Sequence, residues 1–281
     1  MNTMSKIALS IPLFAGLIFA GGYLRFKANT NEQVRTLFAG AEQKEQVVTP
    51  EMLEGLPQPV QRYLHYSGVV GKPLVSTVRL KQQGRIRQDE SSPWMPLKAE
   101  EYYTVSPPTF VWQAGARVAG IPLMRIRDSY VAGTGRMFIT AGGLFTVGDM
   151  QGAEMDQGSM MRYLNEMMWF PSAFLSDYIT WEAIDDNSAR VLMTGHGRQI
   201  SAVITFDDRG RLTNFTGERY RDNGDGTSDL VLWSTPVTAY GEFGGISIPV
   251  QGRGVWHLES GDLTYIELDI LEVEYDRPDT Y

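Results

Sequence analysis

The segment Glu154–Leu175, EMDQGSMMRYLNEMMWFPSAFL, decides the fold of this chain. It is rich in methionine and carboxylates, and its apolar spacing predicts a helix from Asp156 to about Trp169. One broad face of this helix carries Met160, Met161, Leu164, Met167 and Met168. The opposite face carries Arg162, Asn165 and Glu166. Such a helix must bury its apolar face against something else in the fold.

The sequence on both sides of this helix changes to an alternation of apolar and polar residues, the pattern of half-buried strands. Strands are predicted before it at Val78–Lys81, Leu97–Thr104, Phe110–Ala114, Leu123–Arg127 and Asp128–Thr140. After it they are predicted at Ala189–Thr194, Gln199–Phe206, Leu212–Tyr220, Asp229–Trp233, Val255–Leu258 and Asp262–Glu274. Short turns join them, which favours antiparallel pairing. The predicted fold class is mainly β (α+β): an antiparallel β half-barrel with a helix packed on its concave face.

An uncharged apolar run of eighteen residues, Ile7–Leu24, stands near the amino terminus. This length is at the short end for a membrane-spanning helix and at the long end for a signal-peptide core. Ala20 and Gly22 would suit cleavage, whereas the adjacent Arg25 and Lys27 are typical of a retained anchor. The retained anchor is the favoured interpretation, and cleavage is the alternative.

The predicted domain organisation follows from these segments. Residues 1–30 form a transmembrane anchor or signal peptide, and residues 31–68 form a helical stalk and lead-in with a short helix at Asn31–Gln46. Residues 69–281 form the antiparallel β domain, with one central helical segment at about 156–178.

The charge of the chain excludes several functional classes. The first thirty residues contain three bases and no acid, so the remainder holds 22 bases against 33 acids, a balance of −11. Such a body repels nucleic acid. The three histidines are far apart in the sequence, and there is no cysteine for a thiolate site or a disulfide. No metal, no cofactor and no nucleic-acid partner is predicted.

The methionine face of the helix has two interpretations. It could be ordinary core, or it could line a cavity for acyl chains, since methionine is flexible and polarizable. A curved sheet covered by one apolar helix encloses a cavity more readily than a flat sheet does. On the second interpretation the ligand-binding residues are Met160, Met161, Leu164, Met168, Trp169, Phe170 and Trp112.

The carboxylates of the segment also have two interpretations. Glu154 and Asp156 precede the predicted helix, where acids favour capping and the helix dipole, and Glu166 has the spacing of a surface pair with Arg162. No catalytic residue is therefore assigned. If the protein is an enzyme, the candidates are Glu154, Asp156 and Tyr102.

Several sequence segments together resemble a protein family: LPQPVQRYLHYSG, WMPLKAEEYYT, the central segment, WEAIDD, and IPVQGRGVWHL. They are similar to an uncharacterised bacterial family, a domain of unknown function that usually carries an N-terminal hydrophobic segment. The late pattern around Gly245-Ile246-Ser247-Ile248-Pro249 is loosely similar to the lipoprotein carriers LolA and LolB. That resemblance implies a half-barrel closed by helices over an apolar acyl-chain cavity.

The function predicted from the sequence is that of a membrane-tethered envelope protein that binds a lipid or a lipid-modified protein between sheet and helix. The predicted partners are a lipid or acyl chain, and the membrane through the N-terminal segment; no protein partner is identified. The expected location is the bacterial cell membrane, with one spanning segment and the soluble domain on the periplasmic or extracytoplasmic side. Two alternatives stay open: a carboxylate-dependent hydrolase or isomerase, and a structural or partner-binding envelope module.

Overall fold

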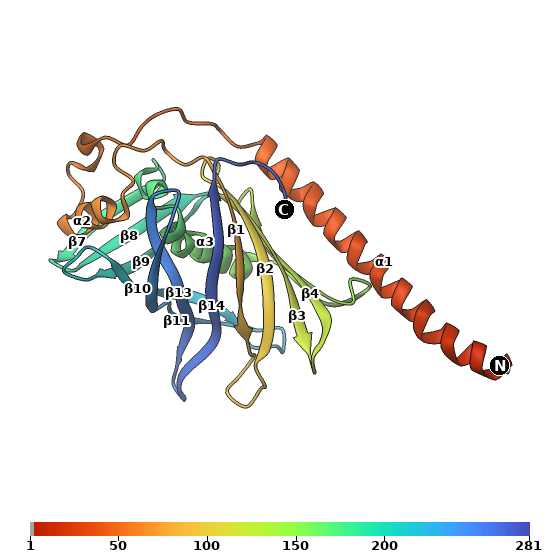
Figure 1. The fold of residues 1–281 in the computed structure, drawn as a ribbon. Coiled ribbons are helices and arrows are strands. Elements are labelled where there is room, and N and C mark those ends of the chain that lie inside the picture. The colour runs from red at the N-terminus through yellow and green to blue at the C-terminus, as the bar shows by residue number, and fades with distance from the viewer. Residues whose placement is uncertain (1–2) are drawn as a thin grey trace.

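The computed structural model describes the backbone of residues 3–281 and the side chains of residues 16 and 18–281 (Figure 1). Its helices are α1 (Thr3–Ala39), α2 (Gln58–Ser67) and α3 (Ala153–Glu166), with 3-10 turns at Pro50–Leu53, Met167–Trp169 and Pro171–Leu175. The first strands are β1 (Thr77–Ile86), β2 (Met95–Thr104), β3 (Thr109–Val118), β4 (Ile121–Val131), β5 (Thr134–Ala141) and β6 (Phe145–Met150). The others are β7 (Ile179–Asp185), β8 (Ser188–Gly195), β9 (Arg198–Phe206), β10 (Leu212–Asp222), β11 (Ser228–Ser234), β12 (Val237–Phe243), β13 (Ile246–Leu258) and β14 (Gly261–Tyr275).

The described strands form one 14-stranded antiparallel sheet. Its order is β6-β5-β4-β3-β2-β1-β14-β13-β11-β10-β9-β8-β7, and β12 pairs with β13 beside this path. The sheet thus joins two meanders along the pairing of β1 with β14, which runs from Val78 opposite Tyr275 to Ile86 opposite Ile266. The chain passes from one edge of the sheet to the other through α3, which lies in the concave face (Figure 1). The predicted half-barrel with a helix on its concave face is confirmed.

Alternating side chains bury one face of most strands, as predicted. On β8, Ala189, Val191 and Met193 are buried, and on β9, Ile200 and Ile204 face the same core. The same period places Leu97, Ala99, Glu101 and Tyr103 of β2 on the concave face. The sheet therefore directs one residue in two toward α3.

The helix α3 begins and ends three residues earlier than predicted. It starts after Gly152, whose φ of 120° breaks the strand direction and which supplies no side-chain cap. It gives way to 3-10 turns before Pro171, because the residue preceding a proline is disfavoured in the α conformation.

The polar face of this helix is buried. Asn165 is 7% exposed and Glu166 is 4% exposed. The curved sheet surrounds α3, which contacts β4, β5, β9 and β10. A helix enclosed in this way is buried on nearly all sides, so its polar residues must find partners within the protein.

The first helix is longer than expected and packs on the convex face of the sheet. Instead of a separate short helix at Asn31–Gln46, α1 continues unbroken to Ala39. Its last turns form a small apolar cluster, comprising Val34, Leu37 and Phe38 of α1 with Tyr102 of β2 and Val111 of β3. The helix then projects beyond the domain toward its amino end (Figure 1).

Within the described residues, no helix combines the length and the apolar character needed to cross a bilayer. The apolar run Ile7–Leu24 begins among residues whose side chains lie outside the described part of the chain. The anchor and the three-part division of the chain stay predictions.

Candidate functional site

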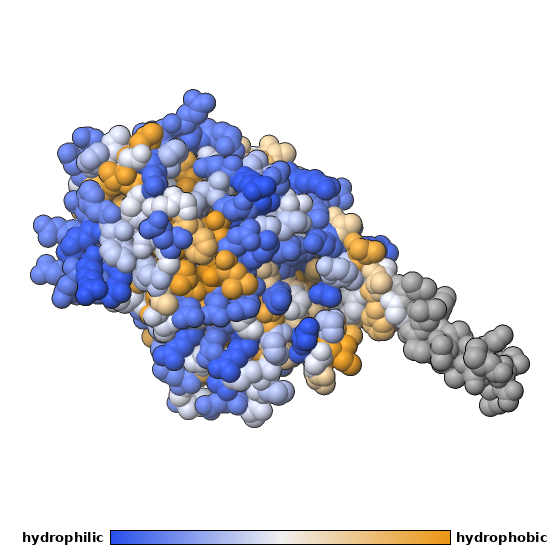
Figure 2. All heavy atoms as spheres, in the orientation of Figure 1, coloured by the Kyte–Doolittle hydropathy of each residue, from blue (hydrophilic) through white to orange (hydrophobic). Residues whose placement is uncertain are grey.

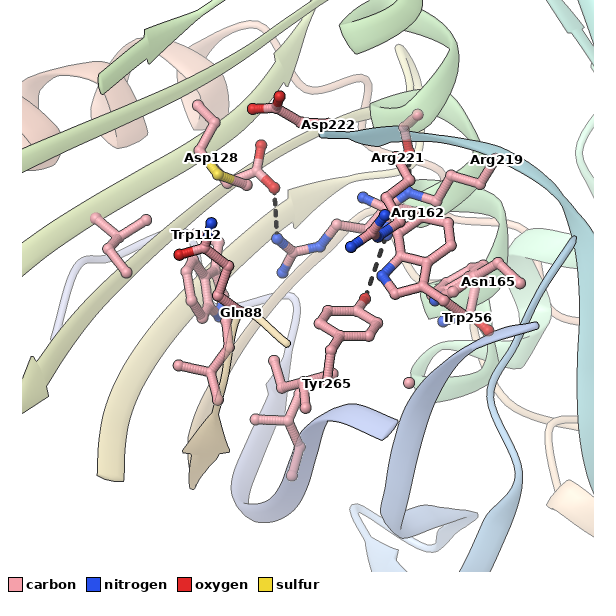
Figure 3. A pocket seen from close by; sticks show the side chains of 18 of the residues that line it. Gln88, Trp112, Asp128, Arg162, Asn165, Arg219, Arg221, Asp222, Trp256 and Tyr265 are labelled. Atoms are coloured by element: carbon pink, nitrogen blue, oxygen red, sulfur yellow. Dashed lines mark hydrogen bonds and ion pairs between the residues drawn. The ribbon is translucent and has the colours of Figure 1, made fainter. Parts of the chain in front are cut away.

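A cavity of about 1120 Å³ lies between α3 and the concave face of the sheet (Figure 3). Residues of β3, β4 and β5 form one wall, and residues of β10, β11, β13 and β14 form the other. The cavity reaches the surface at the β10–β11 turn, where the exposed residues Gly224, Gly226 and Thr227 line it. Its volume is at the upper end of the roughly 300–1,000 Å³ typical of small-molecule sites.

The walls of the cavity are mainly apolar and aromatic. Four of the six tryptophans of the chain line it: Trp112, Trp169, Trp233 and Trp256. The β4–β5 wall adds Ile126 and Ile139, and the β14 wall adds Leu268 and Ile270. These side chains can bury a hydrocarbon chain, and the indoles would report its presence by fluorescence.

Arg162 of α3 is the centre of a buried ionic cluster beside the cavity. Its Nη1 lies 2.6 Å from Oδ2 of Asp128 on β4, and its Nη2 lies 2.8 Å from Oε1 of Glu101 on β2. Its Nε lies 2.7 Å from Oε1 of Glu166, one helical turn away. The guanidinium also stacks 5.0 Å from the ring centroid of Trp112. One cation therefore serves three carboxyl groups, and the prediction that Arg162 and Glu166 form a surface pair was wrong.

A network of neutral donors completes this cluster. Gln82 Nε2 donates to Glu101 Oε2, and Trp112 Nε1 donates to Gln82 Oε1. The Tyr103 hydroxyl donates to Glu166 Oε2. The other oxygen of Asp128, Oδ1, is buried and has no hydrogen-bond partner among the described residues.

The cluster places three carboxyl groups around one cation in the protein interior, and burial raises the pKa of two of them. Burial raises the pKa of Glu101 well above its usual value, the Glu166 charge adds to the rise, and Arg162 opposes it. Burial also raises the pKa of Glu166, although Arg162 partly offsets this. We conclude that the cluster holds a proton at a pH where exposed carboxyl groups are ionised.

A model of a family of unknown function (DUF6544) matches residues 46–268. The chain belongs to this family. The match confirms the resemblance to an uncharacterised domain family that the sequence phrases carry. No curated protein matches this DUF6544 sequence.

Three solved structures are similar to the DUF6544 chain in fold. One is a domain assigned to outer-membrane lipoprotein sorting in Vibrio parahaemolyticus, with 8% identity, a TM-score of 0.39, and coverage of 81% of this chain and 92% of that chain. A LolA superfamily protein from Nitrosomonas europaea has 9% identity, a TM-score of 0.40, and coverage of 76% and 92%. A DUF1329 family protein from Desulfovibrio piger has 12% identity, a TM-score of 0.39, and coverage of 79% and 94%. These likenesses carry no ligand or activity over to the DUF6544 chain.

The structure divides the seven predicted ligand-binding residues of this DUF6544 chain into two groups. Trp112, Met168 and Trp169 line the cavity. The residues that do not line it are Met160, Met161, Leu164 and Phe170, which are fully packed in the core. Ligand binding by all seven stays a prediction, and the first three are the ones that a cavity ligand would touch.

The three residues of the enzyme alternative are not brought together. Glu154 and Asp156 lie in the first turn of α3, whereas Tyr102 faces α1 on the opposite side of the sheet. Neither acid caps the helix with its side chain. Asp156 instead accepts a hydrogen bond from the Gly135 amide at 2.8 Å and pairs with Arg198 at 2.7 Å. The predicted capping role was wrong. The side chain of Asp156 connects the helix to β5 and β9.

A second polar constellation lies outside the cavity. Ser234 Oγ is 2.8 Å from Nε2 of His257, and Nδ1 of His257 is 2.7 Å from Oδ1 of Asp262. This is the order of a Ser-His-Asp triad, but the serine is 2% exposed and the side chain of Asp262 is 66% exposed. A catalytic triad needs the reverse, an accessible hydroxyl and a buried acid. The group therefore links β11, β13 and β14.

Sequence reasoning missed Glu101 and Asp128, although a signal for each was present. Glu101 falls in the buried phase of β2, between Ala99 and Tyr103, and Asp128 falls between Ile126 and Tyr130 of β4. A carboxylate in the apolar phase of a strand predicts a buried partner. Among the described residues of the DUF6544 chain, no group of three or more histidine or acidic side chains is arranged to hold a metal.

Proposed function

We propose that this protein binds a hydrophobic ligand with an acyl chain in the cavity between α3 and the sheet. The observation that supports the proposal is the apolar cavity of about 1120 Å³. Burial of each methylene group contributes about 0.8 kcal/mol, so affinity should rise about fourfold for each carbon added to the chain. Chain length therefore dominates the affinity until the cavity is filled.

We also propose that α1 holds the domain at the bacterial cell membrane, on the extracytoplasmic side. Exposed apolar side chains gather where α1 leaves the domain (Figure 2): Ile18, Phe19 and Leu24 of α1, and Leu144, Phe145 and Val147 of β5–β6. We call these six residues the rim patch. Gly22 approaches Leu144, and Gly142 approaches Phe19, so the two segments lie side by side. Val147 also lines the cavity, so the rim patch is continuous with the cavity wall.

The ligand proposal is tested with the full-length protein purified in mild detergent. Native mass spectrometry should show a co-purifying lipid. A brominated acyl-chain probe should quench the intrinsic fluorescence, because four tryptophans line the cavity. Saturated fatty acids of increasing length should displace a fluorescent fatty-acid analogue with rising affinity.

A filled cavity supplies the matched control. Ile139→Trp adds volume on the cavity wall, and Phe138→Trp changes the neighbouring residue, whose side chain does not line the cavity. We expect the first variant to fold and to bind the analogue at least tenfold more weakly, and the second to bind like the wild type. Equal affinity of both variants, or absence of binding by the wild type, would overturn the proposal.

The tether is tested by fractionation of cells that express the full chain. The protein should remain with the membranes and keep Met1 or Asn2 as its first residue. A soluble protein that begins at Tyr23 or close to it would show that the segment is a cleaved signal.

A second candidate function is acid–base catalysis at Glu166. Glu166 lines the cavity, and burial raises its pKa, as a general acid requires. Turnover of an ester or isomerisation substrate that Glu166→Gln abolishes, with probe affinity unchanged, would favour the enzyme. A protein with neither turnover nor bound ligand would favour the structural module.

A further inference from the structure

Arg219 of β10 is held in the cavity without an acidic partner. Its Nε donates to the Gly158 carbonyl at 2.9 Å, and its Nη1 donates to the Tyr265 hydroxyl at 3.4 Å (Figure 3). Its guanidinium carbon lies 4.8 Å from the ring centroid of Trp233 and 5.8 Å from that of Trp256. These contacts fix the position of the charge, yet none of them neutralises it.

Arg221 lies two residues further along the same strand and also lines the cavity. Strand alternation directs it to the same face as Arg219. Its one side-chain hydrogen bond among the described residues goes to Asn223 Oδ1, at 3.5 Å. Two guanidinium groups thus stand on one stretch of the wall (Figure 3).

The acids that line the cavity do not compensate these two arginines. Asp128 and Glu166 are bound by Arg162, and Asp149 is bound by Arg136. Within the described chain, neither Glu154 nor Asp222 forms an ion pair with Arg219 or Arg221. Arg162, by contrast, contacts three carboxyl groups. A charge in an apolar wall is costly unless an opposite charge binds to it.

We propose that Arg219 and Arg221 form a subsite for the anionic head group, a carboxylate or a phosphate, of the amphiphile whose chain fills the cavity. The inference rests on the proposed function and adds the head-group class to it. Planar guanidinium groups bind carboxylate and phosphate through paired N–H donors, and the Tyr265 hydroxyl is a further donor beside them.

The carboxyl-rich cluster at Arg162 gives the amphiphile a direction. One guanidinium faces three carboxyl groups there, so an anion is repelled from that part of the cavity. The head group is therefore held at β10, and the chain lies along the apolar walls of β4, β5 and β14.

The experiment compares ligands with the same chain and different head groups. Oleate, oleyl alcohol and oleylamine compete against a neutral fluorescent probe on the full-length protein. We expect oleate to bind at least tenfold more tightly than oleyl alcohol, and oleylamine to bind most weakly. Arg219→Gln and Arg221→Gln should each weaken oleate binding by about tenfold to a hundredfold, because a hydrogen bond between charged groups is lost.

The controls separate the head group from the chain. Both variants should keep their affinity for oleyl alcohol within about twofold, and Arg209→Gln, in an exposed turn, should bind both ligands like the wild type. If Arg219→Gln does not fold, Arg221→Gln alone tests the subsite, since Arg221 makes fewer contacts. Equal binding of oleate and oleyl alcohol to the wild type overturns the subsite and leaves the lipid function intact. Binding of neither ligand overturns the function itself.

A last arm distinguishes a lipid head group from a free anion. Inorganic phosphate at millimolar concentration should not displace oleate, because the chain supplies most of the affinity. Phosphate that binds as tightly as oleate, and loses this affinity in Arg219→Gln, would show that the two arginines serve a free anion and would overturn the proposal.

Discussion

Nη1 of Arg162 lies 2.6 Å from Oδ2 of Asp128, and this ion pair joins α3 to β4 beside the ligand cavity. The same guanidinium holds Glu101 of β2, so a single side chain cross-links the helix to two strands. The positions of the cavity wall and the helix are therefore coupled through one residue.

Arg162→Met should cost about 3–5 kcal/mol of unfolding free energy, because it leaves buried carboxyl groups without a cation. Arg162→Lys should recover only part of this loss, since one ammonium cannot reproduce three directed contacts. Urea denaturation at neutral pH measures both. The control is Arg85→Met, which breaks an exposed pair with Glu267 and should change the unfolding free energy little. Similar costs at Arg162 and Arg85 would contradict the role of the cluster.

Glu101→Gln should change how stability depends on pH. The pKa of Glu101 is raised from its usual value of 4.5, so above that pH the folded state binds more protons than the unfolded state. The stability that this group contributes is fully present below pH 4.5 and is lost as the pH rises through the folded pKa. The Gln variant lacks this loss, so its stability relative to the wild type should increase from about pH 4.5 upward.

Denaturation series between pH 4 and pH 8 give this difference. Glu267→Gln, on an exposed strand position, provides the reference for a charge change without burial. A difference between Glu101→Gln and the wild type that does not vary with pH would show that Glu101 is ionised in the folded protein.

Substitutions to alanine should distinguish packed core from cavity wall. Met160 is fully buried and does not line the cavity, so Met160→Ala should cost about 2–5 kcal/mol and leave probe affinity unchanged. Ile139 already faces empty space, so Ile139→Ala should cost less and weaken probe binding. Thermal unfolding and probe titration of the two variants test this. A larger stability loss for Ile139→Ala, together with weaker probe binding by Met160→Ala, would place the cavity elsewhere.

The two acids of the first turn of α3 should respond differently. Asp156→Asn loses the ion pair with Arg198 and should cost about 1–3 kcal/mol. Glu154→Gln should be nearly neutral, because Glu154 is exposed and does not cap the helix. Chemical denaturation measures the unfolding free energy of both variants. Equal losses of unfolding free energy would indicate that both acids cap the helix.

The strands and the central helix could be predicted because their patterns are local. A period of two marks Leu97–Tyr103, and the apolar spacing around Met160 marks the helix. The half-barrel could be predicted because short turns join the strands and only one helical segment interrupts them. Only the ends of the helix shifted, for reasons of local turn chemistry at Gly152 and Pro171.

The site depended on distant pairings that no local pattern contains. Arg162 is 61 residues from Glu101 and 34 residues from Asp128 in the sequence. An amphipathic pattern predicts which face of a helix is polar, but a curved sheet that surrounds the helix can bury that face as well. The side of β10 that carries Arg219 likewise becomes part of a cavity only when β10 lies opposite β4 and β5.

The strand at the middle of the sheet, β14, is also the last of the described strands to be synthesised. Arg79 of β1 pairs with Glu274 of β14 across 195 residues of sequence, so β1 remains an open edge until β14 has left the ribosome. At roughly 5–20 residues per second this takes about 10–40 s. During that time the nascent β1–β6 meander exposes a free edge and an apolar face, both of which favour aggregation. The order of synthesis therefore sets how long a growing chain needs protection from its neighbours.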